Sequence, residues 1–268
     1  MTEATRYRDA SARRRGNFIA FRTIFTKELA RFLRIWLQTI LPSAITMSLY
    51  FIIFGNLIGQ RIGSMGGFNY MQYIAPGIVM MAVITNSYSN VVSSFFGAKF
   101  QRHIEEILVA PVPNVLILAG YVLGGVARGL IVGIVVTVIA LFFTELSIHS
   151  YWITITVVAL TATLFSIGGF INAIFARKFD DISIVPTFVL TPLTYLGGVF
   201  YSIDLLPEPW RSLSLGNPVL YMVNAFRYGI LGVSDIDLTT AFTVIVVFTL
   251  GLFAFALILL ERGVGLRS

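Results

Sequence analysis

Two acidic residues in a short polar loop are the first candidates for function in this sequence. Glu105 and Glu106 lie in the stretch 99–113 (KFQRHIEEILVAPVP), which begins basic and turns apolar before two prolines. Proline stops a helix, so the pattern predicts a short charged helix with an apolar end. Such a helix is suited to docking into a groove on a soluble partner. A turn at a membrane surface fits the same spacing, and the pattern alone leaves both interpretations open.

Polar residues inside apolar segments are the second set of candidates. Asn86, Asn90, Ser93 and Gly97 recur at spacings of four, three and four, which places them on one face of a helix. We expect helix packing to explain this stripe before a substrate path does. Arg128 lies in the middle of another apolar segment, where a charge costs roughly 2.5–3.5 kcal/mol and needs a partner or water. It either bonds to carbonyls or hydroxyls in a bundle or lines a polar cavity, and we expect no carboxylate at its depth.

Several kinds of chemistry are excluded by the residues present. The sequence has no cysteine, and its two histidines, His103 and His149, lie in separate hydrophilic segments, so we expect no metal site. No paired carboxylates or nucleophile–base set can be placed together, so no catalytic residue is expected. The phosphate-binding motif G-x-x-x-x-G-K-[ST] is also absent. We therefore predict neither an enzyme nor a chain that binds a nucleotide or another cofactor.

Composition indicates a membrane protein. Of the 268 residues, 57% are hydrophobic and 12% are charged, against about a quarter charged in soluble domains. The net charge of +6 does not indicate nucleic-acid binding, because the basic residues lie at the borders of long apolar stretches. The sequence predicts an all-α membrane protein.

The apolar stretches predict six transmembrane helices. Each is about the length that crosses 30 Å of hydrocarbon. A turn at 63–67 must interrupt the gap between Arg61 and Lys99, and Pro76-Gly77 marks the expected start of the second span. The expected spans within the transmembrane domain 35–260 are 35–58, 76–98, 115–143, 152–175, 182–201 and 238–260.

The segments before the first span form a tail and a helix. Residues 1–16 are polar and basic, and no cleavable signal core follows them. From 17 to 34 the apolar residues recur every three or four positions, which predicts an amphipathic interfacial helix. Its apolar stripe consists of Phe18, Phe21, Phe25, Leu29, Phe32 and Trp36. Residues 261–268 form the expected C-terminal tail.

The connection between spans five and six, 202–237, is half apolar and contains three prolines. It is too broken for one helix and too apolar to remain solvated, so we expect short or re-entrant helices that fold back on the spans.

The basic residues predict the orientation. With both termini in the cytoplasm, fifteen Lys and Arg residues lie inside and three lie outside, and Arg128 lies within a span. The positive-inside rule therefore predicts cytoplasmic N- and C-termini.

The sequence also resembles the ABC-2 family of permeases. The resemblance rests on YIAPGI at 73–78, IEEILVAPVP at 104–113, PLTYLGGVFYSIDLLPEPW at 192–210, Asn217-Pro218 and Ala225-Phe226-Arg227, in this order. It covers almost the whole chain and is closest to small bacterial inner-membrane permeases.

The resemblance implies a homodimeric exporter driven by ATP. Two copies of a separate ATPase chain would bind ATP and Mg, and membrane lipids would surround the spans. It implies that 99–110 is the coupling helix, with Arg102, Glu105, Glu106 and Leu108 in contact with the ATPase, and that 18–34 is an elbow helix. An external cap containing Trp210, Asn217, Pro218 and Arg227 would close the outer mouth of the path, unless it is a packed lid with no gating role.

The expected substrate is lipid-like, a glycan or an amphiphilic drug-like molecule, moved out across the inner membrane. Asn86, Asn90, Ser93 and Arg128 are the candidate path residues. An ion- or proton-coupled secondary transporter would need acids or histidines within the spans, and we expect all of them at or outside the span ends. A non-transporting membrane scaffold is the remaining alternative.

Overall fold

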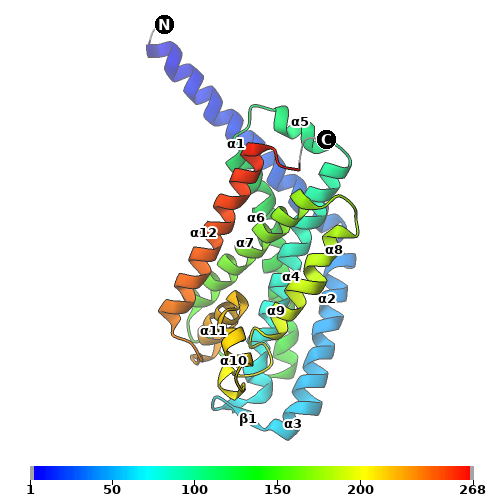
Figure 1. Cartoon of the computed structure of the whole chain (residues 1–268), viewed down its shortest axis with the longest axis vertical. Helices are drawn as coiled ribbons and strands as arrows, with labels where there is room; N and C mark the ends of the chain where they lie inside the picture. The colour runs from blue at the N-terminus through cyan, green and yellow to red at the C-terminus, as the bar shows by residue number, and fades with distance from the viewer. Residues whose placement is uncertain (1–2, 266–268) are drawn as a thin grey trace.

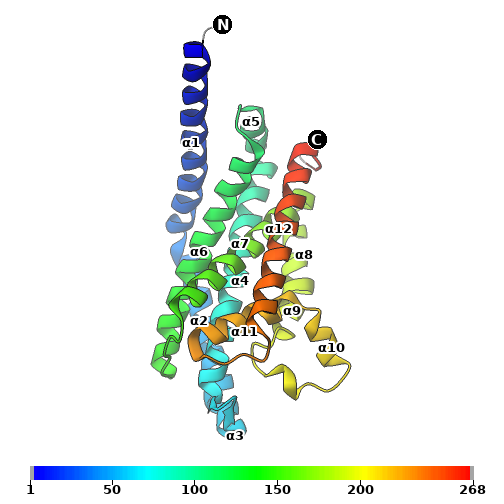
Figure 2. The same cartoon turned by 90° about the vertical axis from the view of Figure 1, so that its left-hand side faces the viewer.

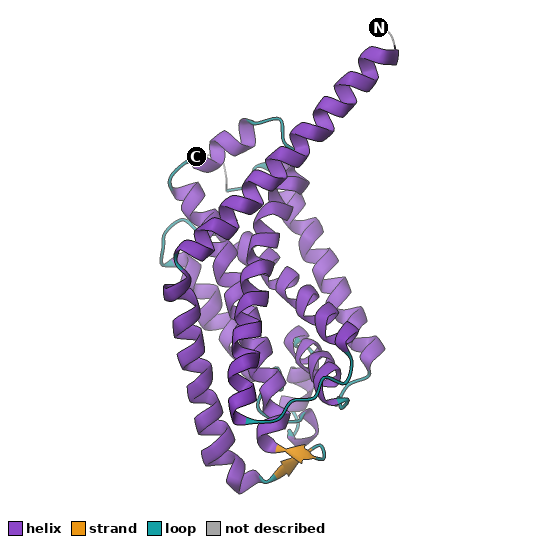
Figure 3. Cartoon of the chain, turned by 180° about the vertical axis from the view of Figure 1, so that it is seen from behind, coloured by secondary structure: helices purple, strands orange, loops and turns teal. Residues whose placement is uncertain are grey.

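Long helices dominate the computed structural model, which describes residues 3–265 (Figure 1). The strands β1 (Ser64–Met65) and β2 (Phe68–Asn69) pair as one antiparallel hairpin (Figure 3). The helices, in chain order, are α1 (Glu3–Arg34), α2 (Trp36–Tyr50), η1 (Phe51–Ile58), α3 (Gly59–Ile62), α4 (Tyr70–Phe100), α5 (His103–Val109), α6 (Asn114–Phe143), α7 (Tyr151–Phe175), α8 (Asp181–Val185), η2 (Pro186–Leu190), α9 (Thr191–Tyr195), η3 (Ile203–Leu205), α10 (Trp210–Leu215), α11 (Pro218–Leu231) and α12 (Leu238–Arg262).

The bundle has two distinct ends. Helix α5, the projecting start of α1 and the end of α12 lie together at one end, which we call the α5 end (Figures 1 and 2). The β hairpin and α3 lie at the opposite end, which we call the hairpin end, and α10 and α11 lie toward it. The expected turn at 63–67 is this hairpin, with Gly63, Gly66 and Gly67 at positive φ.

Helix α1 is longer than the predicted interfacial helix. It begins at Glu3, not at residue 17, because 3–15 contain good helix formers and no glycine or proline. The face that packs on the bundle contains Ile24, Glu28 and Phe32. Much of the predicted apolar stripe is free of the bundle, and Phe18 is 64% exposed.

Five helical stretches among the described residues are long and apolar enough to cross a membrane: Trp36–Ile62, Tyr70–Phe100, Asn114–Phe143, Tyr151–Phe175 and Leu238–Arg262. They correspond to predicted spans one, two, three, four and six. The predicted start of span two at Pro76 was wrong, because α4 begins at Tyr70 and contains Pro76. The side chain of Gln72 accepts a hydrogen bond from the backbone N–H of Asn69 (3.3 Å), as in a capping box, which starts the helix earlier.

The predicted span five, 182–201, is shorter and less regular. Helices α8, η2 and α9 are consecutive five-residue pieces between Asp181 and Tyr195. Together they rise about 22 Å, which is less than the roughly 30 Å of a hydrocarbon core. Pro186 and Pro192 interrupt the backbone bonds, and Gly198 at positive φ turns the chain. A sixth full span therefore stays a prediction.

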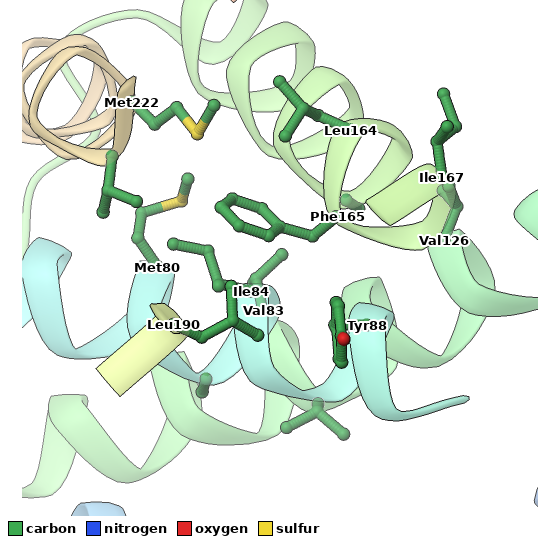
Figure 4. Packing of buried hydrophobic residues seen from close by; sticks show 14 of the residues in the cluster. Met80, Val83, Ile84, Tyr88, Val126, Leu164, Phe165, Ile167, Leu190 and Met222 are labelled. Carbon is green, nitrogen blue, oxygen red and sulfur yellow. The ribbon is translucent and has the colours of Figure 1, made fainter. Parts of the chain in front are cut away.

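Helix α4 is the centre of the bundle, and most of its side chains are buried. Figure 4 shows Phe165 of α7 directed toward Met80 and Ile84 of α4, with Met222 of α11 close by. Glycines on neighbouring helices allow this close approach. A Cβ atom at Gly169 of α7 would come within 2.5 Å of the backbone oxygen of Tyr88.

The contact at Gly169 yields a stability prediction. Gly169→Ala forces α7 away from a backbone atom that cannot rotate aside, so we expect a clearly lower unfolding temperature of the purified protein in detergent. Gly168→Ala is the matched control, since its nearest atoms are ring carbons of Tyr88 at 3.9 Å. Equal unfolding temperatures for the two variants would contradict the close packing of α4 and α7.

Candidate functional site

Helix α5 presents charged side chains at its end of the bundle. Arg102 precedes the helix in a left-handed conformation (φ 61°), which turns the chain sharply after α4. Ile104 is buried and anchors α5, whereas Arg102, Glu105 and Glu106 are exposed. Leu108 is half-buried against the core, and Val109, 86% exposed, is the apolar residue that the helix presents outward. The predicted coupling residues thus lie together, with Leu108 turned partly inward.

A pocket of about 630 Å³ lies beside α5. Lys99, at the end of α4, donates hydrogen bonds to the backbone oxygens of Ile174 (2.5 Å) and Ala176 (2.8 Å), and so caps the end of α7. This fixes the wall of the pocket. Its lining is Phe96, Lys99, Phe100, Arg102, Ile104, Glu105, Ile174, Phe175, Ala176, Arg177, Val264 and Gly265.

The candidate path residues separate into three environments. Arg128 is buried and donates to the Asn86 Oδ1 atom (3.0 Å), and Asn86 Nδ2 donates to the Ser43 hydroxyl (3.0 Å). The backbone and side-chain oxygens of Asn90 instead accept hydrogen bonds from Arg31. Ser93 is exposed and donates to the backbone oxygen of Ser89 on its own helix. Only Asn86 and Arg128 are brought together.

Sequence reasoning missed a buried acid on α1. Glu28 is fully buried, and its Oε1 atom accepts a hydrogen bond from the Ser94 hydroxyl (2.6 Å). It packs on Gly124 of α6, one helical turn before Arg128. Burial raises the pKa of the Glu28 carboxyl, while the Ser94 hydrogen bond and the charge of Arg31 oppose this. The available signal was its spacing, four residues from both Ile24 and Phe32.

A second pocket, of about 430 Å³, forms a groove between α2, α4 and the α8–α9 segment. Hydroxyl and amide groups alternate with apolar side chains along it. The hydroxyls of Tyr50 and Tyr195 meet at 2.9 Å at one edge, beside the ring of Phe200. Asn86 is the only candidate path residue in the lining, which is Pro42, Ser43, Thr46, Met47, Tyr50, Met81, Thr85, Asn86, Pro186, Thr187, Leu190, Thr191, Thr194 and Tyr195.

Arg227 holds the cap segment onto the bundle. It is fully buried on α11 and donates to the backbone oxygens of Gly198 (2.6 Å) and Tyr73 (3.2 Å). Its guanidinium also lies 4.0 Å from the centre of the Tyr73 ring, a cation–π contact. The hydroxyl of Tyr73 donates to Asp235 in turn (3.1 Å). Arg227 is therefore an internal tie and not an exposed residue of the cap.

The other cap residues have distinct places. Asn217 caps α11 by accepting from the backbone N–H of Val219 (3.0 Å), and it donates to the backbone oxygen of Leu193 (2.6 Å). Pro218 occupies the first helical position, where its missing N–H costs nothing. Trp210 begins α10 and is half-exposed. Within 202–237, α11 is thus packed against the bundle and mostly buried, whereas η3 and α10 are mostly exposed.

The buried position of Arg227 predicts a large effect on stability. Arg227→Ala removes buried hydrogen bonds to the backbone oxygens of Gly198 and Tyr73 and to the side chain of Asn224, and we expect it to lower the free energy of unfolding by about 3 kcal/mol. Arg211→Ala is the control, since Arg211 pairs with Asp204 (3.3 Å) on the surface, where a pair contributes about 0–1 kcal/mol. Denaturant unfolding in detergent measures both. Similar losses for the two variants would contradict the role of Arg227 as a tie.

Comparisons with known proteins agree with this architecture. The family model described as "ABC-2 type transporter" matches residues 19–231. The chain is 61% identical over 251 residues to the Inner membrane transport permease YadH of Escherichia coli K12, covering 94% of this chain and 98% of that relative. It is 21% identical over 201 residues to Nodulation protein J of Rhizobium leguminosarum bv. viciae, covering 73% and 76%. The chain therefore belongs to the ABC-2 type transporter family.

Proposed function

We propose that this chain is the permease subunit of an ATP-driven exporter in the bacterial inner membrane. Its similarity to a relative named an inner membrane transport permease supports the location and the class. The observation that carries the proposal is α5, a short helix that presents Arg102, Glu105 and Glu106 outward at one end of the bundle. A soluble ATPase with complementary charges would dock there, bind ATP and Mg, and supply the energy.

The groove between α2, α4 and α8–α9 supports an amphiphilic substrate. Hydroxyls of serine, threonine and tyrosine can bond to sugar or headgroup oxygens, while the methionine, leucine and proline side chains contact acyl or aromatic groups. A lipid-like, glycan or drug-like molecule fits this mixture. Glu28 does not favour an ion-coupled transporter, because it lies on α1, outside the predicted spans, and its Oε1 atom already accepts a hydrogen bond from Ser94.

A homodimer would complete the groove. Exposed apolar side chains follow both of its edges, on α2 at Leu41, Ile45 and Leu49 and on the α8–α9 segment at Ile184 and Phe188. These faces suit a second copy of the chain or lipid acyl chains, and a second copy would supply the missing wall. Two permeases would bind two ATPase subunits at their α5 ends.

The orientation follows from the ends of the bundle. The start of α1, α5 and the end of α12 lie together, and fourteen of the basic residues that the structure describes belong to the segments predicted to lie on this side. The positive-inside rule favours a cytoplasmic position for this end.

Single cysteines test this topology, because the native chain has none. Ser64→Cys, Ser147→Cys and Ser212→Cys lie at exposed positions toward the hairpin end, and we expect an impermeant thiol reagent to label them in spheroplasts. Ser11→Cys is the inside control and should react only after the membrane is opened. Labelling of Ser11→Cys alone in unopened spheroplasts would reverse the assignment.

Removing the acidic pair on α5 tests the partner. The double variant Glu105→Ala with Glu106→Ala should lose permease-stimulated ATPase activity or assembly with the ATPase, while its unfolding temperature stays native because both side chains are exposed. Glu145→Ala removes an exposed acid from the opposite end of α6 and should change neither. Full assembly and stimulation in the double variant would refute docking through these residues.

A further inference from the structure

A buried acid and a neighbouring arginine join α1 to α4. Glu28 has no solvent exposure: its Oε1 atom accepts a hydrogen bond from Ser94 (2.6 Å), whereas Oε2 accepts no hydrogen bond and lies 3.6 Å from the guanidinium of Arg31. The Nη2 atom of Arg31 donates to both the backbone oxygen and the side-chain oxygen of Asn90 (2.9 Å each). Helix α1 is therefore bonded to α4 at two positions one helical turn apart.

The same region of α1 also lies against α6 without space for another atom. A Cβ atom at Gly124 would come within 2.5 Å of the Glu28 Cβ atom, and one at Gly120 within 2.6 Å of an Ile24 methyl group. Glycine at these positions lets the two helix backbones approach closely. Helix α1 thus contacts both α4, which precedes α5 in the chain, and α6, which follows it.

These contacts are poorly explained by stability alone. Burying a carboxylate is costly, and a well-packed apolar side chain of similar size is often at least as stabilising. Apolar contacts, however, allow one helix to slide along another, whereas hydrogen bonds at Asn90 and Ser94 fix the register of α1 along α4. The cluster therefore fixes the position of α1 relative to α4.

We propose that Glu28 and Arg31 are positioning residues that make α1, α4 and α6 move as one body with α5. The proposal rests on the proposed function, because the movement is driven by an ATPase that pushes on α5. A displacement of α5 is then transmitted to α1, and through the chain at Ile35 to α2, which forms one wall of the groove. Glu28 and Arg31 act through helix position and touch no substrate.

Spin labels can measure the contact of α1 with α4 and α6, which we call the joint, because the native chain has no cysteine. Arg22→Cys on α1 and Val115→Cys near the start of α6 are exposed sites for a label pair that lies outside the proposed docking surface on α5. In the full-length permease alone, pulsed electron paramagnetic resonance should give a narrow distance distribution with Glu28 present. Glu28→Ala should broaden it, and Lys27→Ala, which removes an exposed neighbouring charge, should not.

The complex with the ATPase gives the second readout. The distance between the labels should be the same without nucleotide and with ATP trapped, whereas in Glu28→Ala it should change between the two states. Permease-stimulated ATPase activity should fall about five- to tenfold, the size of a modest coupling free energy, with assembly retained. Ser94→Ala, which removes one hydrogen bond, should give a partial effect and replaces Glu28→Ala if that variant does not fold.

The outcomes separate this proposal from the proposed function. A distribution in Glu28→Ala or Ser94→Ala as narrow as the native one overturns the joint, as does a native label distance that changes when nucleotide binds. Failure of the native permease to assemble with any ATPase overturns the proposed function instead, and the measurement on the permease alone still decides whether the joint exists.

Discussion

The close packing of α4 against α6 and α7 is the contact on which the rest of the structure depends. Glycines at the crossings bring helix backbones so near that Gly169 lies against the carbonyl of Tyr88. In an apolar medium, helices gain little from burying apolar surface and associate through close packing and internal hydrogen bonds. Several buried polar side chains accordingly bond across to a neighbouring helix, and α4 supplies partners for Glu28, Arg31, Arg128 and Arg227.

Two polar clusters result, and both are attached to α4. Toward the α5 end, Arg31 bonds to Asn90 and Arg128 bonds to Asn86. Toward the hairpin end, Arg227 bonds to the backbone of Tyr73. One buried helix therefore links the surface proposed to receive the ATPase, the wall of the groove and the cap segment. Helix α4 extends from the turn at Arg102, before α5, to the hairpin end.

Much of this fold could be predicted from the sequence, because long charge-free stretches have only one stable arrangement in a membrane. Four of the expected spans agree closely with the structure. The predicted start of the second span is too late, because a proline is common in a first helical turn whereas Pro76 lies inside α4. Span five was overestimated, since apolar composition does not show where prolines interrupt a helix. Of the site, the exposed charges of α5 followed from their local pattern. The burial of Glu28 could not be predicted, because a hydropathy pattern assigns the charged residues of α1 to the surface. Only the packing in three dimensions shows that this acid faces the bundle.

The central claim is that α5 is the surface through which a soluble ATPase drives this permease. A photo-crosslinking amino acid at Val109, the outermost apolar side chain of α5, tests it in living cells. The account predicts a single major adduct whose partner, identified by mass spectrometry, is a nucleotide-binding subunit, with no such adduct from the same probe at Ser147 near the hairpin end. Adducts from Val109 to lipid alone, or the same ATPase adduct from Ser147, would contradict the account.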